Sequence, residues 1–590
     1  MRHKFFYMKT TIFRLKHKLL FCASLFCYLS FSQDLERQMT LVRPFEPSVS
    51  DAQKITRLPN LQDTFSIRPT FIYSIASHRI DTRFDITPVP PVRVQPLTQT
   101  KLYHGYMKLG FGTLPNISAD VAINTLRNRE YAAGALFGFN HADGEVKLDN
   151  DEKVIGKYSD ISGKLFGKRF FRNNSILFGE LGASGQTAYN YGYDTNAVDV
   201  NGNPPNLVDD SDLRKSYFFA DANIGIRSSH FRADRLNYNV QLDYKFARNK
   251  LNENVLNNLA SETKDISERI YSENAFTFSA QLDNNMFGGN LKLDQFQRSI
   301  DFDSLRNNFA LDLNPWFMLD NDSVQLKVGM RVAVYKEGDK DTQYAIFPSI
   351  EFQFTLLKDI FIPFLGIDGY MQPNSYRSIV NENPFITPGL AVPMSKTKLQ
   401  IYAGLKGTIT SKLGYYLRLD FINTDKEHFF VNDAEFSLHQ NHFTVVTDDM
   451  NTFRFKGELY FNPVESIEFG LKANYFKYQL KRELHAWHKP DLTLDFLAKY
   501  NLNNKIIANL DVMHIGKRYA RVRDFSVTDG IAYNPEQLKS VLSFNVGAEY
   551  RYTKTFSLFL KLNNIGSKYD RWNFYPTRRF SAMAGFTYSL

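Results

Sequence analysis

Long segments in which apolar and polar residues strictly alternate are the feature that most restricts how this chain can fold. The clearest segment runs from Leu236 to Phe246, where every second side chain is apolar and the intervening ones are polar. A period of two places successive side chains on opposite faces of a β-strand. The same pattern recurs over residues 413–421, 542–552 and 580–590. Each of these strands is therefore expected to separate two different environments.

The length and number of these segments favour a membrane barrel over a soluble sandwich, in which strands also alternate. Many segments reach ten residues or more, whereas strands of soluble proteins average about five or six. A tilted membrane-spanning strand needs about 9 to 11 residues, with an apolar outside and a polar inside. The polar faces here carry charges, as a wet lumen would. Roughly 20 to 24 such segments follow one another, and bacterial barrels have even strand numbers. The sequence therefore predicts an all-β fold, a transmembrane antiparallel β-barrel of about 22 strands over residues 101–590, with no helical segment.

The N-terminal 32 residues have the layout of an export signal. Four basic residues between positions 14 and 18 precede an apolar run of 13 residues, Leu19 to Phe31. That run is too short to cross a bilayer as a helix, so we interpret residues 1–32 as a signal peptide. The only two cysteines, Cys22 and Cys27, lie within it. The mature chain therefore has no disulfide, thiolate metal site or thiol nucleophile.

Residues 33–100 differ from the rest of the mature chain. They contain eight of the 22 prolines and no glycine, a composition that suits an extended segment better than a sheet interior. We predict a short, proline-rich periplasmic extension with brief strands near Thr40–Val42 and Phe65–Tyr73, partly ordered against the periplasmic mouth or a partner. In the barrel, we predict long loops at residues 190–213, 248–265, 374–396 and 521–537.

The end of the chain resembles the closing strands of TonB-dependent receptor barrels. The resemblance rests on Phe556–Tyr569, on Tyr575–Phe580 and on Gly585–Leu590. It implies recognition by the barrel-insertion machinery during biogenesis, although the last residue is Leu590 where that family usually has Phe. The family's plug is a glycine-rich domain about twice as long as residues 33–100. The chain therefore resembles a receptor barrel that lacks the plug domain, and the resemblance does not imply TonB-driven transport.

Charged residues on the polar faces are the candidate functional residues, since they are expected to face the lumen. Two interpretations remain open: a solute path or surface that holds a filling segment, and cross-strand charge pairing inside a wet barrel. The lumen-facing candidates are Asp243, Lys245, Arg418, Asp420, Arg454, Lys456, Glu458, Glu468, Lys472, Glu549 and Arg551.

Other constellations have simpler explanations than a functional site. His485 and His488 flank Trp487, and we interpret this segment as a turn with Trp487 in the interfacial aromatic girdle rather than as a metal site. The Asp- and Asn-rich residues 194–212 lack the spacing of a calcium loop. The net charge of +9 is dispersed rather than clustered, which argues against nucleic-acid binding. We therefore expect no catalytic residue, metal or cofactor, and no enzymatic activity.

The sequence thus predicts an integral barrel of the outer membrane of a Gram-negative cell envelope, in contact with outer-membrane lipid. Its function is expected to be that of a channel or transport-related barrel. The alternative is a non-transport scaffold or assembly component of an outer-membrane protein complex. Residues 33–100 would then bind a periplasmic or outer-membrane protein partner.

Overall fold

The computed structural model describes residues 102–590, except 114, 127, 149, 196–212, 233–234, 251–270, 300–306, 434–439, 525–531, 567–568 and 579. The predicted signal peptide, the extension with its two brief strands, and most of the Asp- and Asn-rich segment lie outside the described residues.

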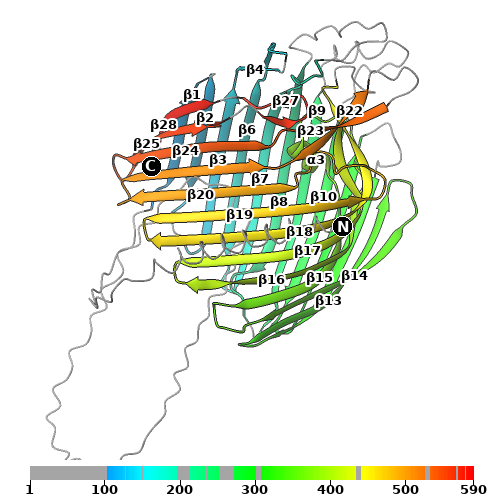
Figure 1. Cartoon of the computed structure of the whole chain (residues 1–590). Coiled ribbons are helices and arrows are strands. Elements are labelled where there is room, and N and C mark those ends of the chain that lie inside the picture. The colour runs from blue at the N-terminus through cyan, green and yellow to red at the C-terminus, as the bar shows by residue number, and fades with distance from the viewer. Residues whose placement is uncertain are drawn as a thin grey trace, which may run out of the picture. The chain divides into compact units, whose positions relative to one another are not determined.

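A single antiparallel sheet of 22 strands forms the wall of the molecule, as predicted (Figure 1). Each wall strand pairs with the next wall strand along the chain. Short hairpins that are inserted in some of the connections do not belong to the wall. In chain order, the wall strands are β1 (Gly105–Gly112), β2 (Asn116–Asn124), β3 (Tyr131–Ala142), β6 (Tyr158–Phe170), β7 (Ser175–Tyr189), β8 (Arg214–Ser228), β9 (Asn237–Lys250), β10 (Tyr271–Asp283), β11 (Phe287–Arg298), β12 (Asn307–Asp320), β13 (Val324–Glu337), β14 (Gln343–Phe354), β15 (Ile362–Gln372), β16 (Ser395–Thr410), β17 (Leu413–Asn432), β18 (Phe443–Val464), β19 (Ile467–Leu480), β20 (Leu492–Leu502), β21 (Ile506–Ile515), β24 (Val541–Arg551), β25 (Phe556–Asn563) and β28 (Ser581–Ser589).

The sheet closes on itself where its first and last strands meet. β1 pairs with β28 over seven residue pairs, from Tyr106 opposite Ser589 to Gly112 opposite Met583. The terminal residue completes this seam, because the Leu590 carbonyl oxygen accepts hydrogen bonds from the N–H groups of His104 and Gly105. Closure leaves the first and last strands of the sheet paired, which is the condition for a sheet to span a bilayer.

The two ends of the barrel differ in the length of their connections. One end holds tight turns, such as 321–323, 411–412 and 465–466, together with the start of β1 and the end of β28. We call it the short-turn end. The other end holds the long connections, including 190–213, 251–270, 373–394 and 516–540, which coincide closely with the predicted loops.

Several short elements lie in the long connections. They include one helix, so the expectation of a chain without any helical segment was wrong. These elements are β4 (Glu145–Lys147), β5 (Lys153–Ile155), α3 (Tyr376–Glu382), β22 (Arg518–Asp524), β23 (Ala532–Leu538), β26 (Asp570–Trp572) and β27 (Tyr575–Pro576). Among the described residues, no helix has both the length and the apolar character needed to cross a membrane.

The outer face of the wall is apolar and exposed. Leu242 of β9 is 47% exposed, Ile224 of β8 is 56% exposed and Leu419 of β17 is 61% exposed. Soluble monomers rarely expose contiguous apolar surface of this extent, whereas a lipid-facing wall requires it. The alternation predicted for residues 236–246 and 413–421 therefore corresponds to an outer face and an inner face.

An arginine is expected to have opposite effects on the outer and the inner face of β9. Leu242→Arg, near the middle of the strand, is expected to lower the free energy of unfolding in lipid vesicles by about 2 to 4 kcal/mol. Gln241→Arg should be nearly neutral, because Gln241 faces inward and hydrogen-bonds Asp243, with which an arginine can pair. Urea titration of both variants in vesicles measures the difference. Equal losses would contradict the assignment of faces.

Candidate functional site

Five of the predicted lumen-facing residues come together on two neighbouring strands. Asp420 of β17 accepts from Arg418, at 2.7 Å from Nη2, and from Arg454 of β18, at 3.1 Å from Nε. Further along β18, Nζ of Lys456 lies 3.0 Å from Oε1 of Glu458. Asp420 and Glu458 are almost fully buried, so these ion pairs are part of the wall rather than free charges in the lumen. This part of the set therefore shows the cross-strand pairing that was one of the two open interpretations.

The other candidates lie elsewhere around the wall. Asp243 accepts a hydrogen bond from Asn223 at 2.5 Å, and Lys245 lies opposite Asp221 in the register between β8 and β9. Glu549 and Arg551 of β24 form a pair 3.4 Å apart. Glu468 pairs with Lys499 of β20 at 3.6 Å, and Lys472 lies opposite Asp495. The candidates thus line the inner face of several strands and do not converge on one site.

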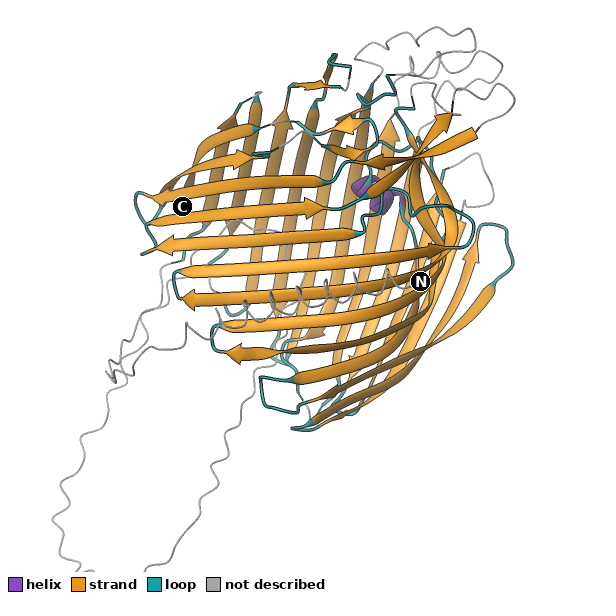
Figure 2. Cartoon of the chain, viewed as in Figure 1, coloured by secondary structure: helices purple, strands orange, loops and turns teal. Residues whose placement is uncertain are grey.

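A different feature dominates the end with the long connections. Residues 373–394, which join β15 to β16, fold inward and carry α3 with them (Figure 2). We call this segment the lid loop. Arg377 of α3 reaches Asp221 on the inner face of β8, at 3.0 Å. On the same strand, Lys215 donates to the carbonyl oxygen of Ile386 at 2.5 Å, and Tyr217 donates to that of Pro384 at 2.6 Å. The lid loop therefore crosses the lumen from β15 and β16 to β8, seven strands away from β15.

A buried ion pair fixes the first part of the lid loop. Glu273 of β10 and Arg298 of β11 lie 2.7 Å apart, and both side chains are 2% exposed. Glu273 accepts a hydrogen bond from the N–H of Tyr376 at 2.8 Å, and Arg298 donates to the carbonyl oxygen of Asn374 at 2.7 Å. Each member of the pair therefore also holds lid-loop backbone, which helps to offset the cost of burying it.

The lid loop is also the centre of the largest buried apolar cluster among the described residues. Its residues Tyr376, Ile379 and Val380 are almost fully buried, and they occupy one side of α3 at the spacing of a helix. The cluster combines this loop with wall residues and with the connection 564–580. Its buried members are Tyr217, Phe219, Ala247, Tyr271, Tyr376, Ile379, Val380, Ile386, Val392, Phe430, Phe443, Trp572 and Tyr575.

The connection 564–580, between β25 and β28, reaches the lid loop from another part of the wall. The rings of Phe385 and Tyr575 stack with centroids 3.9 Å apart. The Tyr191 hydroxyl donates to the carbonyl oxygen of Pro576 at 3.0 Å, which adds the beginning of the connection between β7 and β8. Connections rooted at three places on the wall thus share one hydrophobic core. We call this assembly the lid.

His488 joins the lid to the wall through both ring nitrogens. Nδ1 lies 2.9 Å from the carbonyl oxygen of Phe430, which only accepts, so Nδ1 carries the proton. Nε2 accepts from the N–H of Asn573 at 3.3 Å, so it carries none. The ring is therefore neutral and has no lone pair left for a metal. Among the residues that the structure describes, no group of three or more His, Cys, Asp or Glu side chains is placed to hold a metal ion.

The neighbouring tryptophan corrects one prediction. Trp487 is not in an interfacial girdle, since it is buried among Phe429, Val431 and Met450, and its indole N–H donates to Glu483 at 2.7 Å. The short segment around it packs as a small core of its own, because the long strands β17 and β18 extend far enough to support it.

Acid is expected to loosen the lid at His488. Burial lowers the pKa of this imidazole to about 4 from its usual 6.5, and the nearby Arg518 adds to the shift. An opened lid would bind a proton below pH 6.5 while the closed lid would not. Lid stability should therefore fall as the pH drops from about 6.5 to about 4, by about 3 kcal/mol in total. Hydrogen exchange of residues 373–394 at pH 7 and pH 4.5 measures this. His488→Gln should remove the pH dependence, and its persistence would exclude His488 as the cause.

The sequence interpretation missed the lid, although one signal was present. The segment 374–396 was predicted as a long loop, yet it contains Tyr376, Ile379, Val380, Phe385 and Ile386. A solvated loop has no need of so many large apolar side chains, and the first three follow helical spacing. That composition indicates a loop that packs against something, but not what it packs against.

Solved structures that resemble this chain include transporters and outer-membrane receptors. The FrpB iron transporter from Neisseria meningitidis aligns with 11% identity over 83% of this chain and 82% of its own, with a TM-score of 0.60. The pyoverdine outer membrane receptor FpvA from Pseudomonas aeruginosa gives 12% identity over 83% and 79%, with a TM-score of 0.59. The ferric-catecholate import receptor Fiu from E. coli K12 gives 10% identity over 83% and 82%, with a TM-score of 0.59.

At these identities, the likeness establishes the fold. The resemblance of the C-terminal strands to TonB-dependent receptor barrels is thereby confirmed at the level of the barrel. No model of a known protein family matches the sequence. No curated protein is significantly similar to it.

Proposed function

We propose that this protein is a transport-related β-barrel of the outer membrane, without a plug domain, whose own loops close the lumen. The main support is the combination of an exposed apolar outer face, a polar inner face and a lid built from inward-folded connections. A barrel of 22 strands is wide enough to pass solutes unless something occupies it. In this proposal the lid does the work that a plug does in the receptors it resembles. Residues 33–100 are not needed as a plug, and the protein has no enzymatic activity.

Bacterial barrels carry short turns on the periplasmic side and long loops outside the cell. The proposal therefore places the lid at the extracellular mouth and both ends of the barrel sequence in the periplasm. The paired charges of β17 and β18 leave little net charge on that part of the wall, which favours polar, uncharged solutes over ions of one sign.

The alternative proposal is a non-transport scaffold or assembly component. It draws support from the packing of the lid, in which Tyr376, Ile379 and Val380 of α3 are buried and would have to be exposed on opening. In that case residues 33–100 would bind a protein partner, and the barrel would remain closed throughout.

Solute flux separates the two proposals. The full chain should fractionate with outer membranes and run differently on gels before and after boiling. In proteoliposomes, transport predicts measurable uptake of neutral sugars under some condition that opens the lid, such as mild acid. A scaffold predicts no uptake at any pH, together with a stoichiometric partner that co-purifies with the detergent-extracted barrel. Recovery as a soluble periplasmic protein would contradict both.

A further inference from the structure

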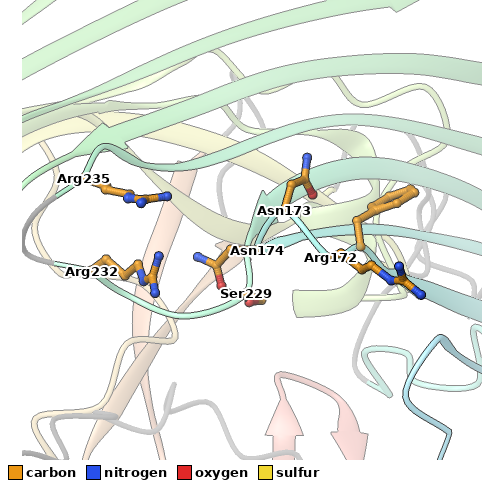
Figure 3. A pocket seen from close by; sticks show the side chains of 7 residues that line it. Arg172, Asn173, Asn174, Ser229, Arg232 and Arg235 are labelled. Atoms are coloured by element: carbon orange, nitrogen blue, oxygen red, sulfur yellow. Dashed lines mark hydrogen bonds between the residues drawn. The ribbon is translucent and has the colours of Figure 1, made fainter.

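Two arginines, Arg232 and Arg235, point into the space between two adjacent turns at the short-turn end of the barrel, whereas the side chain of Arg172 is directed away from them (Figure 3). Residues 171–174 join β6 to β7, and residues 229–236 join β8 to β9. Between these turns lies a pocket of about 420 Å³ (Figure 3). It is lined by Phe171, Arg172, Asn173, Asn174, Ser229, Arg232 and Arg235. The lining contains three cationic side chains and no carboxylate among the described residues.

The backbone under these cations is held in place by a buried asparagine. Asn237 is 6% exposed, and its side-chain oxygen accepts the N–H of Arg232 at 2.8 Å. Its side-chain amide donates to the carbonyl oxygens of Arg232, at 3.0 Å, and of Arg235, at 3.4 Å. One side chain thus clamps the segment that carries two of the three arginines, so less entropy is lost when they bind a ligand.

The other turn is tied to the same segment. The N–H of Ser229 donates to the carbonyl oxygen of Asn174 at 2.9 Å, and the Asn174 side-chain amide donates to that of His230 at 3.5 Å. The two walls of the pocket therefore keep their spacing.

The chemistry of the pocket favours a phosphate group. Guanidinium groups bind phosphate through paired, charge-assisted hydrogen bonds. No described carboxylate forms an ion pair with the side chain of Arg232. The two turns also carry exposed apolar side chains, since Phe231 is 62% exposed and Phe171 and Leu236 are exposed as well. Cations next to exposed aromatic and aliphatic side chains at the end of a lipid-facing wall match the headgroup region of a bilayer.

We propose that this pocket binds the phosphate group of an anionic phospholipid in the periplasmic leaflet, with the acyl chains against the apolar outer face. The proposal rests on the membrane location and orientation proposed above. It assigns Arg232 and Arg235 as the phosphate ligands and Asn237 as the positioning residue that holds the backbone of both.

Lipid binding to the purified full chain in a neutral detergent tests the proposal. The probes are short-chain phosphatidylglycerol, short-chain phosphatidylcholine and inorganic phosphate. Phosphatidylglycerol should bind most tightly, and Arg232→Ala should weaken it about tenfold, with a larger loss when Arg235→Ala is added. Asn237→Ala should weaken binding while leaving the charge of the pocket unchanged. Lys412→Ala, which removes a cation from another turn at the same end, is the matched control and should have no effect.

Each other outcome overturns the proposal. Equal binding of inorganic phosphate would identify a free-anion site, and equal losses from Lys412→Ala and Arg232→Ala would indicate non-specific attraction to the charged rim. Absence of saturable phosphatidylglycerol binding would exclude the site. A failure of the proposed membrane location is distinguished separately, because an uninserted protein would not show heat-modifiable migration on gels.

Discussion

Removal of residues 376–392 is expected to raise the single-channel conductance of the reconstituted barrel by roughly tenfold or more, because it takes away the segment that crosses the lumen. A short Gly-Ser linker in their place would keep β15 and β16 joined. The deletion also removes Phe385, whose ring stacks on Tyr575, so the connection 564–580 should lose its support within the lid. Planar bilayer recordings measure the change.

A second deletion distinguishes the lid from the N-terminal extension. Residues 40–96 also have the length to obstruct the lumen, and their removal alone should leave conductance low if the lid closes the mouth. Conductance is compared for four proteins: the full chain, each single deletion and the double deletion. The comparison shows whether the lid and the extension each block the lumen on their own. Removal of residues 525–531, in the connection between β22 and β23, is the control that shows whether shortening any loop changes the conductance. High conductance after loss of residues 40–96 alone would show that the extension, not the lid, is the barrier.

The wall of the barrel was predictable because its determinants are local. The alternation at Leu236–Phe246 follows from the geometry of one strand, and it assigns Leu242 outward and Asp243 inward without knowledge of any neighbour. A closed bacterial barrel needs an even number of strands, which limits the possible strand counts. The predicted count of 22 strands was correct. The pairing of Asp420 with Arg454 also follows once β17 and β18 are known to be consecutive, since the two residues lie directly opposite each other.

The lid was not predictable because its contacts join distant parts of the chain. Tyr191 contacts Pro576 across 385 positions, and Lys215 contacts Ile386 across 171. No periodic pattern in a loop specifies which opposite wall it will reach. Trp487 was likewise not predictable, because a tryptophan in a turn between strands is typical of an interfacial girdle. Its actual place depends on how far β17 and β18 extend beyond the rest of the wall.

Loss of Arg298 is expected to unfasten the lid without dismantling the barrel. Arg298→Met leaves Glu273 buried without its partner, and breaking such a pair typically costs about 3 to 5 kcal/mol. Arg298 also holds the carbonyl oxygen of Asn374, and Glu273 holds the N–H of Tyr376, so the cost falls on the closed state of the lid. Residues 373–394 should therefore exchange their amide hydrogens roughly a hundred to several thousand times faster. The seam between β1 and β28 should keep its protection.

The double variant Arg298→Met with Glu273→Gln tests whether the buried charge is the cause. A glutamine keeps an oxygen for the Tyr376 N–H and removes the unpaired negative charge, so most of the protection in residues 373–394 should return. Hydrogen exchange of the single and double variants, measured beside the full chain at pH 7, provides the comparison. If the single variant exchanges like the full chain, the ion pair does not hold the lid. If residues 373–394 exchange as fast in the double variant as in the single one, the guanidinium contact with Asn374, rather than the ion pair, stabilises the closed lid.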